Sequence, residues 1–72
     1  MTYEWEVEEP AMNSVFAMGK TDTLASAKEA AILAARQYDK DAGGTELMMY
    51  INDGKRVIRA EWPDTDAWEI DT

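Results

Sequence analysis

The sequence has neither cysteine nor histidine among its 72 residues. Without Cys, no disulfide or thiolate metal site can supplement the small core that such a chain can build. Without Cys and His, the chain lacks the preferred ligands of zinc and copper. A Ser or Cys nucleophile activated by a histidine base cannot be assembled either. The composition therefore predicts a protein with no cofactor and no metal, and one that is not an enzyme.

Long apolar runs are also missing. No run approaches the roughly 20 residues that a membrane-spanning helix needs, and the N-terminus lacks the basic and then apolar pattern of a signal peptide. A chain of this size buries only about 60% of the surface that its unfolded form exposes. Three Trp, three Tyr, one Phe and five Met must therefore provide much of the core volume. We expect one compact domain over residues 1–72, located in the cytoplasm.

Two segments rich in glycine or aspartate do not match the phosphate-binding or calcium-binding loops that such residues can form. Gly43 and Gly44 follow an expected helix instead of preceding one, so they do not form a phosphate-binding loop. The run from Asp39 through Asp41 to these glycines resembles the start of a calcium loop. Its twelfth position, however, is Tyr50 instead of the required Glu. No calcium site is expected here.

Basic residues are absent from both ends of the chain. Residues 1–10 contain four acids and residues 61–72 contain five, so these 22 residues carry a charge of −9. The middle 50 residues have seven bases and six acids, a charge of +1, which gives the −8 of the whole chain. Charge segregated in this way creates a strong local field that favours a basic partner. The same field disfavours direct contact with nucleic acid or anionic lipid.

The acidic ends are predicted to be ordered. At the N-terminal end, apolar and acidic residues alternate strictly, which is typical of a half-buried strand over residues 2–9. Its apolar side is Tyr3, Trp5 and Val7. At the other end, Trp62 and Trp68 are interleaved with the acids, and either anchor the C-terminus in the core or form an interface hot spot. Such anchors indicate that the carboxylates are held on a scaffold.

The remaining pattern predicts a second strand over 14–19, a helix from Leu24 to about Tyr38, and two further strands over 45–51 and 56–62. Asp22 or Thr23 offers the helix N-cap, and small Ala side chains along one stripe let the helix lie close to a sheet. The expected fold is α+β with two layers, one helix on an antiparallel sheet in ββαββ order. Residues 64–72 add either a short fifth strand or a docked turn. One face of this sheet must meet water or a partner.

Asp53 and Gly54 predict a hairpin between the last two long strands, because Asp-Gly suits a type I′ turn. A two-residue loop places Glu46 directly opposite Glu61, and like charges so placed destabilise a sheet. The residues that this register puts on the helix-covered face are Leu47, Met49, Ile51, Ile58 and Ala60.

Glu4, Glu6 and Glu8 project from one side of the first strand, spaced about 6.8 Å apart. One interpretation is a solvated surface that also protects a sheet edge. The other is an imitation of the regularly spaced phosphates of a nucleic acid strand. Like-charge repulsion along this row and between Glu46 and Glu61 favours a role other than folding. The candidate partner-binding residues are Glu4, Glu6, Glu8, Glu9, Glu46, Glu61, Asp64, Asp66, Glu69 and Asp71.

In size, charge and topology, the whole chain resembles the small acidic phage-encoded inhibitors of bacterial defence, including anti-CRISPR proteins. The resemblance implies a non-enzymatic inhibitor that acts in the bacterial cytoplasm by mimicking nucleic acid on a basic protein surface, such as a Cas subunit or another nuclease. The alternative is a small bacterial or phage accessory domain whose acidity serves solubility and which forms a homodimer through its sheet edges. The helix followed by a hairpin resembles such small bacterial domains.

Overall fold

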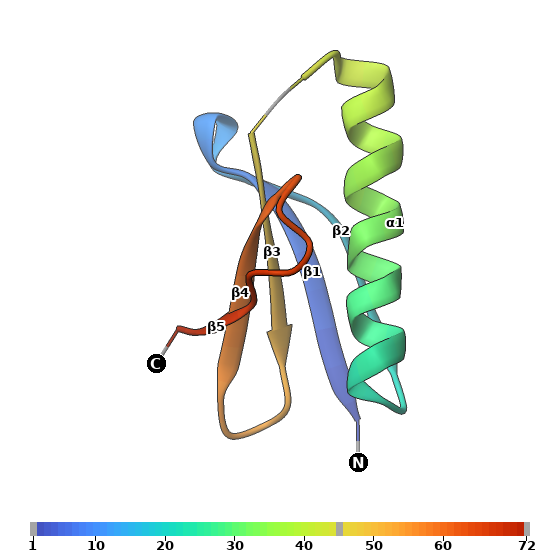
Figure 1. The fold of residues 1–72 in the computed structure, drawn as a ribbon, viewed down its shortest axis with the longest axis vertical. Helices are drawn as coiled ribbons and strands as arrows, with labels where there is room; N and C mark the ends of the chain where they lie inside the picture. The colour runs from blue at the N-terminus through green and yellow to red at the C-terminus, as the bar shows by residue number, and fades with distance from the viewer. Residues whose placement is uncertain (1, 45, 72) are drawn as a thin grey trace.

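The computed structural model describes residues 2–44 and 46–71, and shows one helix packed on one face of a five-stranded antiparallel sheet (Figure 1). The predicted α+β architecture with a short fifth strand is confirmed. The strands follow the spatial order β2-β1-β3-β4-β5. In chain order the elements are β1 (Tyr3–Glu9), a 3₁₀ turn (Pro10–Met12), β2 (Ser14–Thr21), α1 (Leu24–Ala42), β3 (Leu47–Asn52), β4 (Val57–Trp62) and β5 (Glu69–Ile70).

The second hairpin docks on β1, a choice that the sequence left open. β1 pairs with β2 on one side and with β3 on the other, so β2 and β5 form the two edges of the sheet. The acidic strand is therefore an interior strand. Its carboxylates cannot serve to protect an edge, and that part of the solubility interpretation is wrong.

Helix α1 is closed by a cap at each end. The Thr23 hydroxyl accepts a hydrogen bond from the Ser26 N–H at 3.1 Å, which satisfies one of the free donors of the first turn. At the other end Gly43 adopts the left-handed conformation (φ 79°), and its N–H donates to the Asp39 carbonyl at 2.8 Å. The helix continues to Ala42, four residues beyond its predicted end, because no helix-breaking residue precedes Gly43.

The core lies between α1 and the sheet. Ala27, Ala31 and Ala35 are fully buried, and these small side chains bring the helix close to the strands. Ala34, beside Ala35 on the same helix, is only half-buried. On the sheet side the fully buried side chains with the largest volumes are those of Leu47, Met49, Ile51 and Val7.

Four of the five residues predicted for the helix-covered face of the second hairpin are buried, at most 3% exposed. The fifth, Ile58, is half-buried. It lies opposite Ile70 of the two-residue strand β5, which is itself exposed. The short edge strand leaves Ile58 partly open to solvent.

The hairpin register differs from the predicted one by two residues. Asn52 lies opposite Val57, so residues 53–56 form a four-residue loop in place of the expected two-residue turn. Met48, not Glu46, lies opposite Glu61. The predicted repulsion between two opposed glutamates is therefore wrong, and Glu46 lies exposed just before β3. Because side chains alternate with a period of two, this shift leaves every side chain on its predicted face.

Asp53 explains the longer loop. Its Oδ1 accepts hydrogen bonds from the N–H groups of Lys55 at 2.9 Å and Arg56 at 2.8 Å. Gly54 has a positive φ of 96°, whereas Asp53 does not. A type I′ turn requires a positive φ at both central residues, so that turn is not formed.

The C-terminal segment returns to the sheet through two tryptophans. Trp62 and Trp68 both pack against the core on the helix side. Arg36 and Lys28 of α1 lie over their rings, at 6.0 Å from the Trp62 centroid and 5.7 Å from the Trp68 centroid. The Trp68 Nε1 also donates to the Thr65 carbonyl at 2.9 Å. These contacts favour the interpretation of both side chains as anchors of the C-terminus.

Candidate protein-binding surface

Within residues 2–44 and 46–71, no other element covers the sheet face opposite α1, and we call it the open face. The strand registers place on it the side chains that alternate with the buried ones. Asp71 joins this face by pairing with Arg59. The open face consists of Glu4, Glu6, Glu8, Val15, Met18, Lys20, Met48, Tyr50, Asn52, Val57, Arg59, Glu61, Glu69 and Asp71.

The open face is acidic and draws its carboxylates from both ends of the chain. It carries six carboxylates against two bases, a net charge of −4. The structure therefore brings together six of the ten predicted site residues, which are Glu4, Glu6, Glu8, Glu61, Glu69 and Asp71. Strand β3 pairs with β1 on one side and with β4 on the other, which is how residues 4 and 61, far apart in sequence, come to share one surface.

The other four predicted residues lie outside the strand positions that form the open face. Glu9 ends β1 and accepts a hydrogen bond from the Tyr38 hydroxyl of α1 at 2.9 Å, so it ties the strand to the helix. This hydrogen bond, and then burial, raise the pKa of Tyr38. Asp64 and Asp66 lie in the loop between β4 and β5, and Glu46 lies before β3. Asp64 nevertheless lines a small hollow with Glu61 and Glu69 at the border of the open face, whereas the other three do not belong to one surface with the acidic row of β1.

The sequence did not predict that two bases lie on the open face beside the acids. The Lys20 Nζ lies 3.8 Å from the Glu4 Oε1, and the Arg59 Nε lies 3.1 Å from the Asp71 Oδ1. Both pairs are well exposed, and ion pairs of this kind contribute about 0.2–1 kcal/mol each. The sequence around Glu4 does not predict a contact with Lys20, because only the pairing of β1 with β2 brings the two residues together. A basic partner can displace such weak pairs.

Tyr50 fixes the position of one carboxylate of the row. Its hydroxyl donates to the Glu8 Oε1 at 3.0 Å. Burial first, and then this hydrogen bond and the charge of Glu8, raise the pKa of Tyr50. The phenol therefore stays protonated and keeps donating, so Glu8 is held on the open face instead of moving freely.

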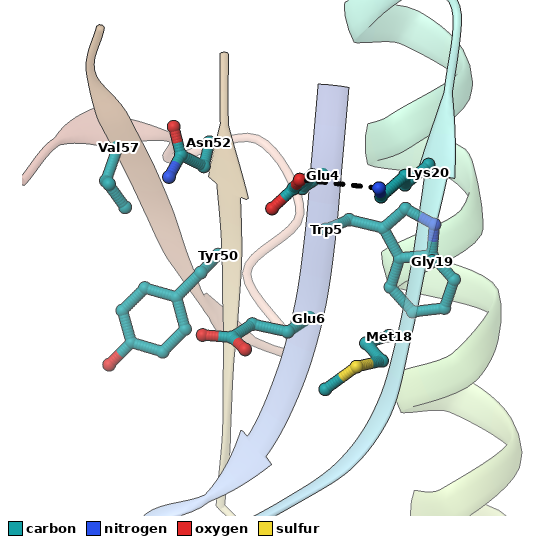
Figure 2. A pocket seen from close by; sticks show the side chains of 9 residues that line it. All are labelled: Glu4, Trp5, Glu6, Met18, Gly19, Lys20, Tyr50, Asn52 and Val57. Carbon is teal, nitrogen blue, oxygen red and sulfur yellow. Dashed lines mark ion pairs between the residues drawn. The ribbon is translucent and has the colours of Figure 1, made fainter. Parts of the chain in front are cut away.

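A groove runs across the open face between β2 and β4, with a volume of about 420 Å³. Figure 2 shows Glu4 and Glu6 on β1, with Lys20 and Met18 on one side and Asn52 and Tyr50 on the other. In residues 2–44 and 46–71, no base lies within ion-pair distance of Glu6. The groove thus combines a carboxylate that lacks a basic partner with apolar walls. The full lining is Glu4, Trp5, Glu6, Met18, Gly19, Lys20, Tyr50, Asn52 and Val57.

This arrangement suits binding of a cationic side chain. Carboxylates accept strong, charge-assisted hydrogen bonds from guanidinium and ammonium groups, and apolar walls suit their aliphatic stems. Metal binding is less well served: the described part of the chain holds no group of three His, Cys, Asp or Glu residues placed to share an ion. Asp39 and Asp41, which resembled a calcium loop, lie within α1. Within the described residues, no helix combines the length and the apolar composition needed to cross a membrane.

Searches against protein-family models, curated proteins and solved structures find no match to this chain.

Proposed function

We propose that this protein is a non-enzymatic inhibitor whose open face occupies the nucleic-acid-binding surface of a basic protein in the bacterial cytoplasm. The most specific form of the proposal is an anti-CRISPR protein acting on a Cas subunit. One observation carries it: six carboxylates from opposite ends of the sequence share one uncovered sheet face with only two bases.

Charge display explains how such a surface would inhibit. Glu4, Glu6 and Glu8 form a row with a spacing of about 6.8 Å, close to twice the 3.4 Å rise of each nucleotide along a strand of B-DNA. A groove that binds nucleic acid presents Lys and Arg at positions suited to phosphates. The acidic row would meet these bases, and its long-range field would accelerate encounter.

The groove adds a specific anchor to this general attraction. An Arg side chain of the partner, entering beside Glu6, finds a carboxylate without a basic partner and the apolar surfaces of Met18 and Val57. Its planar guanidinium can bond one carboxylate with two N–H groups, or bridge Glu4 and Glu6. Lys20 would give up its weak contact with Glu4 in exchange.

A second candidate is an accessory domain whose acidity serves solubility. The pairs Lys20–Glu4 and Arg59–Asp71 favour it, because they neutralise part of the open face within the chain itself. The two candidates differ in what the acids of β1 are for. Only the inhibitor needs these particular carboxylates for binding.

The test removes charge from the open face while keeping side-chain shape. The variant Glu4→Gln/Glu6→Gln/Glu8→Gln loses three charges, and the matched control Glu29→Gln/Asp41→Asn/Glu46→Gln loses three exposed charges away from the open face. Both variants and the wild type compete with labelled DNA for a panel of purified, guide-loaded Cas complexes. The control should displace DNA as the wild type does, and the open-face variant should not.

Salt provides a second measurement within the same assay. Wild-type binding should weaken steeply as salt rises, and the open-face variant should depend less on salt. Equal competition by the wild type and the folded open-face variant would overturn the role of the β1 carboxylates. Equal losses in both variants would show that net charge matters and position does not, which would also overturn the role of the β1 carboxylates.

A further inference from the structure

Strand β2 has one side of its backbone unpaired. Seven of its eight residues pair with β1, and no other strand of residues 2–44 and 46–71 lies along its outer side (Figure 1). An edge strand offers a row of free N–H and C=O groups, which only another extended chain can satisfy in a regular way. The opposite edge, β5, is two residues long and offers little for such pairing.

The β2 edge also lacks most of the features that normally prevent pairing. It contains no proline and no acid, and its single base, Lys20, lies beside Glu4. Val15 is 41% exposed and Met18 is 68% exposed. The bulge between Val7 and Glu8 disturbs only one end, and pairing is regular from Ala17 to Thr21. Natural edge strands are usually shorter, more charged or interrupted.

Charge determines which partner fits this edge. Strand β1 carries four acids and no base, whereas β2 carries one base and no acid. Because β2 has no carboxylate, it offers no charge attraction to a strongly cationic strand. Two copies of the chain, which repel each other elsewhere, can approach here: pairing of the two β2 strands leaves their β1 rows three strand spacings apart, about 14 Å. That distance exceeds the screening length of about 8 Å at physiological ionic strength. Pairing through β5 would instead place Glu69 at the contact.

We propose that β2 pairs antiparallel with β2 of a second copy, forming a symmetric dimer with one continuous ten-stranded sheet. A two-fold axis at Met18 places Met18 of each copy opposite the other on the open face. Each Lys20 then lies opposite Phe16 of the other copy, and the two lysines are separated by about 14 Å along the strand. Such an interface is self-complementary, as a two-fold axis requires. It goes beyond the proposed function, and it would join two acidic open faces side by side.

The test compares two Lys substitutions at exposed apolar residues. Met18→Lys places like charges opposite each other at the axis, while Leu33→Lys makes the same change on α1, where Leu33 is 52% exposed. Sedimentation equilibrium from low micromolar to millimolar concentration should give twice the 8.1 kDa chain mass for the wild type and for Leu33→Lys. Met18→Lys should weaken dimerisation by about tenfold or more, from like-charge opposition and lost packing.

Amide hydrogen exchange of the wild type provides a measurement that needs no variant. Raising the concentration should slow exchange in residues 14–21 and leave β5 unchanged. A wild type that stays monomeric over the whole range would overturn the proposal. So would a Met18→Lys dimer as tight as that of the wild type, or concentration-dependent protection at β5 in place of β2.

Discussion

The indole of Trp5 lies across Gly19 on the neighbouring strand, so closely that a Cβ atom at position 19 would lie 2.7 Å from the indole Nε1 and 2.9 Å from Cε2. The two residues are direct partners in the pairing of β1 with β2. Glycine is required here for space. Its missing side chain lets a half-buried tryptophan of the acidic strand pack flat against the edge strand.

Gly19→Ala should therefore destabilise the protein. The added methyl group meets a rigid ring, not the end of a flexible side chain, so the ring or the strand must move. Overpacking of this kind typically costs about 1–3 kcal/mol. Urea denaturation measures the loss directly. In a Trp5→Leu background the same substitution should cost much less, and an equal cost in both backgrounds would show that the indole is not the obstacle.

Met49→Ala should produce one of the largest losses of stability in the chain. Met49 is fully buried in the middle of β3, and removing its side chain leaves a cavity that costs about 2–5 kcal/mol. Ile58→Ala should cost less, because Ile58 is half-buried. Leu33→Ala serves as the exposed control and should change the free energy of unfolding little. A small effect of Met49→Ala would contradict the assignment of faces in the second hairpin.

The faces of the strands could be predicted from the sequence because they depend only on alternation. Leu47, Met49 and Ile51 point to the helix in either register, since a shift of two residues restores the same side. The register itself depends on the loop. The Asp53–Gly54 pair predicts a turn but not the length of the loop, because that length depends on hydrogen bonds of the Asp53 side chain that form only in the folded loop.

The candidate site was harder to predict, because it depends on strand order. The alternation in residues 3–8 shows that Glu4, Glu6 and Glu8 share a side. It cannot show that β1 is an interior strand, or that Lys20 and Tyr50 lie beside those carboxylates. Such neighbours come from pairings between distant segments. Glu9 shows the converse, because it is acidic and adjoins the row in sequence, but its side chain bonds to Tyr38 of the helix.

Asp53→Ala should lower the melting temperature at neutral pH. The N–H groups of Arg56 and Lys55 donate to the Asp53 carboxylate and hold its pKa below the usual value of 3.8. A depressed pKa in the folded state means that the ionised carboxylate stabilises the fold above pH 3.8. That stabilisation is lost as the pH falls through the lower pKa of the folded state.

The gap in melting temperature between the wild type and Asp53→Ala should therefore be widest at neutral pH and should narrow below pH 3.8. Asp53→Asn is the matched control, since its amide oxygen can accept the same hydrogen bonds without titrating. The gap between Asp53→Asn and Asp53→Ala should be nearly independent of pH. A gap between the wild type and Asp53→Ala that stays constant down to acid pH would show that the charge of Asp53 does not stabilise the loop.

Salt should raise the melting temperature of the wild type. The open face carries a net charge of −4 and the whole chain −8, so carboxylate repulsion opposes folding at neutral pH and low salt. Raising salt from about 0.1 to 0.5 M shortens the screening length from about 10 Å to under 5 Å, below the spacing of about 6.8 Å along the β1 row.

The variant Glu4→Gln/Glu6→Gln/Glu8→Gln should melt higher than the wild type at low salt and respond less to added salt. The control Glu29→Gln/Asp41→Asn/Glu46→Gln removes the same charge from other surfaces, so it separates local repulsion from net charge. If both variants respond to salt alike, the repulsion belongs to the chain as a whole, and the β1 row is not a concentrated source of it.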